Sequence, residues 1–134
     1  MLYGQQGKNN EAAQLFRRAT ENDPRYAQAF VNLGLILASE SRFPEAEQAL
    51  RSAVNIRPDD AQGLSVLAMV LTRMSRGSEA VGYFRKVIEL DPKSPGAHLN
   101  LGIALADQFN LEGALAEFSE AVRLDPNASA AHYN

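Results

Sequence analysis

Two stretches decide the fold: NLGLILASESRFPEAEQALRSAVNIRPDD at residues 32–60 and NLGIALADQFNLEGALAEFSEAVRLDPNA at residues 100–128. They align two 34-residue units apart, and prolines mark the same interval along the chain, at Pro24, Pro58, Pro92 and Pro126. A fixed period of this length is typical of repeat proteins, in which each unit is one supersecondary element that stacks on its neighbours. The 134-residue sequence is therefore an array of similar units.

Other positions repeat at the same interval. Alanine stands twelve residues before each proline, at Ala12, Ala46, Ala80 and Ala114. A large apolar residue stands eight residues before it, at Phe16, Leu50, Phe84 and Phe118. A small residue recurs in the first half of the unit, at Gly34, Ala68 and Gly102. Within each half-unit the apolar residues recur three or four apart, which is the spacing of one helix face, so each unit is predicted to hold two helices.

In the third full unit we expect helices over 96–108 and 111–124. The small residues should mark close approaches of two helix backbones, and the large apolar column should fill the space between successive helix pairs. Asp-Pro pairs should end the second helices, because proline disfavours helical backbone at the residue before it. Ser94 with Pro95 is a typical N-cap and first-turn pair, and Asp59 or Asp60 should cap the helix that follows.

These columns resemble the tetratricopeptide repeat family over essentially the whole chain. The resemblance implies an all-α fold, an alpha-alpha superhelix or solenoid in which the first helix of each unit, helix A, lines the concave side and is followed by helix B. The middle unit departs most from the pattern, since Gly77 stands where Phe43 and Leu111 stand in its neighbours.

The chain is expected to form one array without further domains. A partial repeat at 1–26 begins late in a helix A, near Leu2 and Tyr3. Three full repeats should follow, and then the start of another, with boundaries at 27–60, 61–94, 95–128 and 129–134.

The resemblance also implies a peptide-binding surface on the concave side. Once the expected buried columns are removed, the A helices leave Gln28, Val31, Asn32, Leu35, Gln62, Ser65, Met69, Thr72, Arg73, Leu99, Asn100, Ile103, Asp107 and Asn134. Three asparagines of this set share one column, interrupted by Val66. The column resembles the asparagine ladder in the tetratricopeptide superhelix of O-linked N-acetylglucosamine transferases, where such amides grip a peptide main chain. Local bonds between helices would explain the asparagines equally well.

The expected partner is a protein or peptide segment, extended or helical and partly apolar, because several of these side chains are apolar. Family members that bind acidic carboxyl-terminal tails use paired Lys or Arg residues at these positions. Here Arg73 is the only basic side chain, so an acidic tail is not the expected ligand.

Composition argues against several other classes. The 13 Lys and Arg residues against 16 Asp and Glu residues give a net charge of −3, which does not suit nucleic-acid binding. Cysteine is absent, and the apolar runs are too short to cross a membrane. The amino end does not read as a signal peptide, which favours a soluble, cytoplasmic protein.

No cofactor or metal is expected, and the protein is expected not to be an enzyme. His98 and His132 occupy the column of Phe30 and Leu64, so each should pack between helices rather than bind metal. The carboxylates of the B helices should form a solvated outer face with weak ion pairs, at Glu45, Glu47, Glu112, Glu117 and Glu120.

The leading functional hypothesis is a scaffold that binds a protein or peptide through the concave groove. Two alternatives stay open. The array could be a structural module that stacks through exposed helix ends into homo-oligomers, or the substrate-docking arm of a larger enzyme such as a glycosyltransferase.

Overall fold

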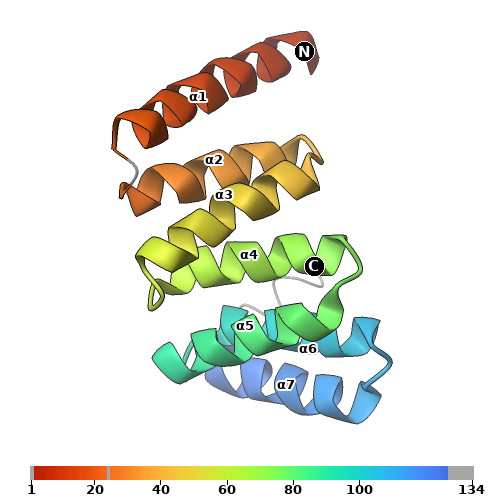
Figure 1. Ribbon diagram of the computed structural model, residues 1–134. Coiled ribbons are helices and arrows are strands. Elements are labelled where there is room, and N and C mark those ends of the chain that lie inside the picture. Colours follow the sequence, from red (N-terminus) through yellow and green to blue (C-terminus); the bar gives the residue numbers. More distant parts are fainter. Residues whose placement is uncertain (1, 24, 127–134) are drawn as a thin grey trace. The chain divides into compact units, whose positions relative to one another are not determined.

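A computed structural model describes residues 2–23 and 25–126 of the chain (Figure 1). These residues form helices and no strands, in the order α1 (Leu2–Asn22), α2 (Ala27–Ser39), α3 (Phe43–Ile56), α4 (Ala61–Arg73), α5 (Gly77–Leu90), α6 (Pro95–Asp107) and α7 (Leu111–Leu124). The helix predicted over 111–124 is observed with those bounds, and the one predicted over 96–108 begins and ends one residue earlier. The all-α architecture is confirmed.

The chain divides into two compact units, Met1–Val70 and Leu71–Asn134, and the division falls within α4. In the first unit α1 packs on α2, and α2 packs on α3. The beginning of α4 lies beside α2, since a Cβ atom on Gly63 would stand 3.6 Å from Val31 Cγ2. In the second unit α5 packs on α6, and α6 packs on α7. Each unit thus contains one complete helical hairpin, α2–α3 and α6–α7.

The turn after each A helix has the same backbone conformation in three successive repeats. Ser41, Ser75 and Phe109 have φ angles of 60°, 62° and 63°, the left-handed region that glycine adopts most easily. The following amide closes the turn by donating to a carbonyl five residues back, as Arg42 N does to Leu37 O at 2.8 Å and Asn110 N to Leu105 O at 2.9 Å. These are Schellman motifs, which satisfy carbonyls at the end of helix A.

The predicted caps are confirmed at two helix starts. Ser94 Oγ accepts a hydrogen bond from Ala97 N at 3.2 Å at the beginning of α6. Asp60 Oδ1 accepts from Gln62 N at 3.2 Å before α4. The side chain of Asn110 caps α7 in the same way, by accepting from Gly113 N at 3.1 Å. Short polar side chains at these positions satisfy amides that have no partner within the helix.

The glycines of the A helices give the hairpins their close packing. A Cβ atom on Gly34 would stand 2.5 Å from Leu50 Cγ, and one on Gly102 would stand 2.6 Å from Phe118 Cε1. The large apolar residue of helix B therefore packs against the glycine of its own hairpin. This contact was not predicted from the repeat pattern, and it forms because the missing glycine side chain leaves room for Leu50 and Phe118 within the hairpin.

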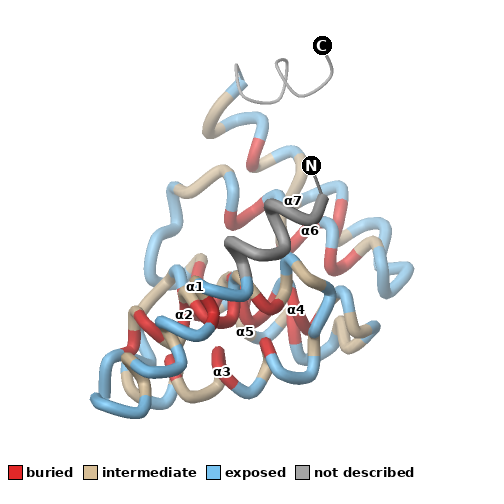
Figure 2. Tube along the Cα trace, turned by 90° about the horizontal axis from the view of Figure 1, so that it is seen from above, coloured by how far each residue is buried: buried red, intermediate tan, exposed pale blue. Residues whose placement is uncertain are grey.

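The repeated alanines of the helix B column are buried in the three full repeats, whereas Ala12 on α1 is half-buried. Ala46, Ala80 and Ala114 lie in the core, and Ala53 and Ala121, which follow two of them by seven residues on the same helix face, are buried as well. Figure 2 shows the buried stretches of the described helices in red. Small side chains at these positions let two helices approach without crowding.

Helix α1 differs from the prediction at the amino end. It runs unbroken from Leu2 to Asn22, and Gly7, which occupies the turn column of Ser41, lies inside the helix. The expected helix A near Leu2 and Tyr3 is therefore not separate from the helix B that follows it, since both are parts of α1.

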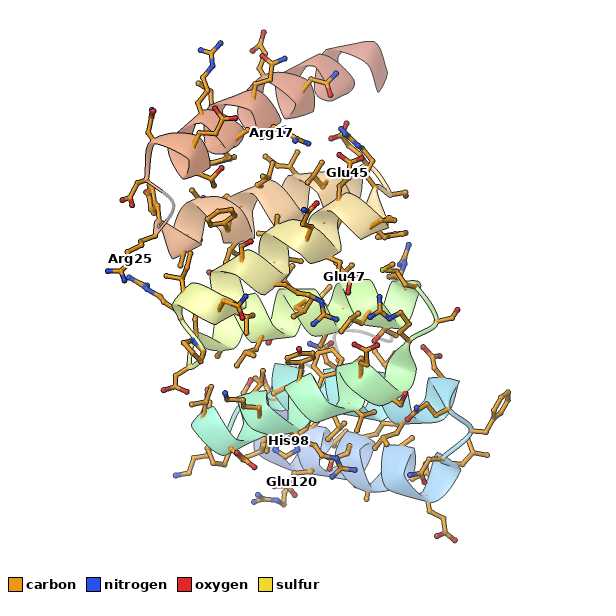
Figure 3. All side chains as sticks on the ribbon, in the orientation of Figure 1. Arg17, Arg25, Glu45, Glu47, His98 and Glu120 are labelled. Carbon is orange, nitrogen blue, oxygen red and sulfur yellow. The ribbon has the colours of Figure 1, made fainter. Side chains whose placement is uncertain are left out.

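Exposed ion pairs lie on the outer side of the first unit. Glu45 on α3 accepts hydrogen bonds from Arg42 and, at 3.2 Å, from Arg17 on α1 (Figure 3). The hydrogen bond from Arg42 is the main reason that the pKa of Glu45 lies below its ordinary value, and the bond from Arg17 adds to it. Pairs this exposed contribute little to stability.

The glycine contacts predict opposite effects for one substitution at two positions. Gly34→Ala should destabilise the protein by about 1–3 kcal/mol, because the new methyl group would overlap Leu50. Gly82→Ala in α5 meets no atom within 4 Å and should stabilise it by about 1 kcal/mol through helix propensity.

Urea denaturation followed by circular dichroism measures both variants. Since the two changes are chemically identical, only the surroundings of the glycine differ. Equal shifts for Gly34→Ala and Gly82→Ala, in either direction, would contradict the packing described for α2 and α3.

Candidate peptide-binding surface

Each A helix keeps a large apolar side chain exposed at one repeat position. The exposed fractions are 39% for Leu35 on α2, 50% for Met69 on α4 and 45% for Ile103 on α6. On α6 the neighbouring turn adds Leu99, which is 40% exposed. In each complete hairpin, the exposed residue directly follows the glycine that contacts helix B. A helix turns about 100° per residue, so the side chain after the glycine is directed away from that contact.

Two residues of the A helices, one from the expected peptide-binding set and one from the asparagine column, are buried rather than exposed. Val31 has no exposed surface and packs against the beginning of α4, where a Cβ atom on Gly63 would stand in ordinary contact with it, 3.6 Å from its Cγ2. The expectation that Val31 contacts a ligand is therefore wrong. Val66, which interrupts the asparagine column, is also buried.

Side-chain amides form a hydrogen-bonded chain on the first unit. Gln28 Nε2 donates to Asn32 Oδ1 at 3.1 Å on the same helix, and lies 3.4 Å from Gln62 Oε1 on α4. Gln28 and Gln62 are equivalent residues of adjacent repeats. The predicted asparagine column is thus joined here to a glutamine column that sequence spacing did not single out. Within the described part of the chain, the amide nitrogens of Asn32 and Gln62 make no hydrogen bond and remain available as donors.

The remaining members of the expected set are distributed over both units. Ser65, Thr72 and Asn100 are half-buried, whereas Arg73 and Asp107 are exposed at the last positions of α4 and α6. Asn134 lies outside the described residues, so the structure describes the asparagine column only at Asn32 and Asn100.

His98 makes a buried polar contact between α6 and α7 (Figure 3). Its Nδ1 lies 2.6 Å from Glu117 Oε2, and its Nε2 lies 2.9 Å from the carbonyl oxygen of Pro92. Both partners are acceptors, and only the protonated ring has two N–H donors, so the geometry matches imidazolium. The expectation that Glu117 belongs to a solvated outer face is therefore wrong, because His98 draws it into the hairpin.

Several forces act on the charge of His98. Burial is the largest and by itself lowers the pKa of the ring, since it disfavours the charged form. The hydrogen bond with Glu117, the bond with the Pro92 carbonyl and the negative charges of Glu117 and Glu120 all raise it. The net result is a pKa above the ordinary value for histidine.

The described residues include no group of three or more His, Cys, Asp or Glu side chains placed to hold a metal ion. His132, the other histidine, lies outside them. Among the helices described, none has the length and apolar character needed to span a membrane.

Comparison with known proteins identifies the class of repeat. The family model described as "Tetratricopeptide repeat" matches residues 1–61 and 66–129. The chain belongs to the tetratricopeptide repeat family. Proteins of this family generally act as scaffolds for protein interactions, and that general role holds for this chain.

Individual relatives show the fold and little more. A segment of 38 residues is 55% identical to the protein CTR9 homolog of Arabidopsis thaliana, but it is only 28% of this chain and 4% of that protein. The solved chain of MamA 41-end from Desulfovibrio magneticus RS-1 aligns with a TM-score of 0.83 at 20% identity, over 92% of this chain and 70% of that solved chain. YrrB, described as a tetratricopeptide repeat protein with an unusual peptide-binding site, aligns with a TM-score of 0.79 at 22% identity, over 93% of this chain and 64% of YrrB.

The His98 contact predicts a pH-dependent stability. Because the pKa of His98 is higher in the folded chain than in the unfolded one, its stabilising contribution is complete below the unfolded pKa of about 6.5 and is lost as the pH rises through the folded pKa. The free energy of unfolding should therefore fall as the pH rises from the unfolded pKa of His98 through its higher folded pKa.

Urea titrations at several pH values measure this slope. The matched variant is His98→Leu, which places the residue type of Leu64 in the same repeat column and should flatten the slope. If wild type and His98→Leu lose stability equally with rising pH, the His98–Glu117 contact does not cause the dependence.

Proposed function

We propose that the chain binds an extended, partly apolar segment of another protein through the exposed faces of its A helices. The observation that carries the proposal is the repeated exposure of Leu35, Met69 and Ile103, at 39%, 50% and 45%. A single exposed leucine is ordinary on a protein surface. A large apolar residue is exposed at the same repeat position twice in the first unit, at Leu35 and Met69, and again in the second unit, at Ile103. This repetition favours a surface on each unit that apolar side chains of a partner cover.

The amide chain supplies the polar half of the proposed recognition on the first unit. Gln28, Asn32 and Gln62 lie along the same helices as Leu35 and Met69. A carboxamide offers a donor and an acceptor, so it can bond a peptide main chain whatever the partner's side chains are. The exposed apolar side chains would then determine specificity for the partner's side chains, and the amides would hydrogen-bond to its main chain.

None of the five side chains of the proposed face on the first unit carries a charge: Gln28, Asn32, Leu35, Gln62 and Met69. Binding to this face should therefore depend weakly on salt, because screening acts on interactions between charges. This separates the proposed mode from the recognition of acidic tails by basic residues, in which affinity falls as salt rises.

Peptides selected from a displayed random library on the intact chain test the proposal. Leu35→Ser combined with Met69→Ser should weaken the selected peptides by at least about tenfold, the effect expected from loss of two apolar contacts. The control is Leu90→Ser on a B helix, because Leu90 is 41% exposed and so resembles Leu35 in type and exposure. It should leave affinity unchanged.

Polar variants in the same assay test the amides. Asn32→Ala with Asn100→Ala should weaken the same peptides while circular dichroism shows unchanged helix content. Peptides that lose affinity with Leu90→Ser, but not with the Leu35 and Met69 variant, would place the binding surface elsewhere and overturn the proposal.

A second candidate is self-assembly through the last described helix. Leu111, Leu115 and Val122 on α7 are 63%, 65% and 44% exposed, and their spacing of four and seven residues places them on one helix face. Val81 and Ile88, the α5 residues equivalent to Leu115 and Val122, are only partly exposed. The α7 face would stack on a second copy of the chain.

Light scattering across a concentration series tests this candidate. Association that grows with concentration and disappears in Leu115→Glu would support stacking, since a charge on a buried apolar contact is unfavourable. A chain that stays monomeric, or one whose association survives Leu115→Glu, would exclude this face as the contact.

A further inference from the structure

A polar cavity lies in the second unit, beside the turns that follow α4 and α6. It has a volume of about 420 Å³ and is lined by Thr72, Ser75, Gly77, Ser78, Asp107 and Gln108. The cavity is separate from the exposed apolar residues of the A helices discussed above. Its lining is dominated by hydroxyl, amide and carboxylate groups.

The absence of a side chain at Gly77 helps to open this space. The equivalent residues are Phe43 and Leu111, so the other repeats place a large apolar side chain at the start of helix B. Here a Cβ atom would already stand 3.2 Å from Gln108 Cγ, so a larger residue would fill the room between the two turns.

Asp107 is unfavourably placed for the fold. It is the last residue of α6, where the helix carbonyls carry partial negative charge and a cation would be preferred. Its side chain is exposed and makes no hydrogen bond or ion pair with the residues that the structure describes. A charge that opposes its helix without a compensating contact points to a role outside folding.

Phe109, two residues later, breaks a second local rule. Its φ of 63° places a bulky side chain in a conformation that favours glycine, and 88% of the residue is exposed. The equivalent turn residues, Ser41 and Ser75, are small and polar. Backbone strain at a residue whose side chain is not buried in the core is typical of positions used for binding.

The charges around the cavity favour a cation. The carboxylate of Asp107 carries a full negative charge, and the carbonyl ends of α4 and α6 add partial negative charge. The amino end of α5 opposes them with partial positive charge. Arg76 is hydrogen-bonded to Glu79, and neither Arg73 nor Arg76 lines the cavity.

We propose that this cavity binds an arginine or lysine side chain of a partner protein. The Asp107 carboxylate pairs with the cation, and the hydroxyls of Ser75 and Ser78 and the Gln108 amide accept its remaining N–H groups. Phe109 directly follows the lining residue Gln108, and its exposed ring offers an aromatic face for the cation or its alkyl stem. The cavity includes Thr72 and Asp107 of the surface expected from the sequence, and Asp107 lies one helical turn after Ile103 on α6. None of Gln28, Asn32, Leu35, Gln62 and Met69 lines it, so the cavity and the face formed by these five residues can be tested separately.

Nuclear magnetic resonance with the ¹⁵N-labelled intact chain tests the site. The probe is a blocked Ala-Arg-Ala tripeptide, and its matched control carries citrulline, which has the arginine shape without the charge. The arginine peptide should shift the backbone amides of Ser78, Asp107 and Gln108 in a saturating manner, and the citrulline peptide should bind at least about tenfold more weakly.

Two variants separate binding from folding. Asp107→Asn and Phe109→Gly should each weaken the arginine peptide at least about fivefold while raising the thermal midpoint, because each removes a local conflict. Glu89→Gln makes the same kind of charge change as Asp107→Asn at an exposed position of α5 and should leave affinity unchanged. Equal binding of the citrulline peptide, unchanged affinity in Asp107→Asn, or no saturable shift at these amides would overturn the proposal.

Discussion

The close contact between a helix A glycine and a large apolar residue of helix B is the constraint on which the hairpins depend. Leu50 packs against Gly34, and Phe118 packs against Gly102. In both hairpins the large residue lies sixteen positions after the glycine. A methyl group at either glycine would overlap its partner. This contact sets how closely the helices approach, and the buried alanines of helix B, such as Ala46 and Ala114, fit that short separation.

The same contact determines what remains on the surface. Once the glycine faces helix B, the following residue faces away from it, and in both complete hairpins that residue is large and apolar. Leu35 and Ile103 are therefore exposed because Gly34 and Gly102 are buried. The proposed peptide-binding face is a consequence of hairpin packing combined with the choice of apolar residues at one position.

The sequence predicted most of the helices because the 34-residue period repeats both the apolar spacing and the stop signals. The bounds of α7 and the Ser94 cap followed from local rules alone. Residues whose environment depends on another helix were predicted less well. Val31 is buried because the beginning of α4 packs beside it, and Glu117 is drawn inward because His98 donates to it. Neither contact repeats along the chain, so periodicity carries no signal for it.

The turn conformations show a related limit. Sequence spacing located the turns, but it did not reveal that Ser41, Ser75 and Phe109 all have positive φ. Most turns of this kind are identified by glycine, and none of these three is glycine. Gly7, the glycine that does occupy the column, lies within α1 and forms no turn.

A double-mutant cycle on Gly102 and Phe118 tests the central contact most directly. Gly102→Ala should lower the free energy of unfolding in the wild-type background, but it should have no effect or raise this free energy when Phe118 is alanine, because the added methyl group then enters vacated space. The same loss of stability in both backgrounds would show that Phe118 does not occupy the position of the missing side chain, and would contradict the account of how these hairpins pack.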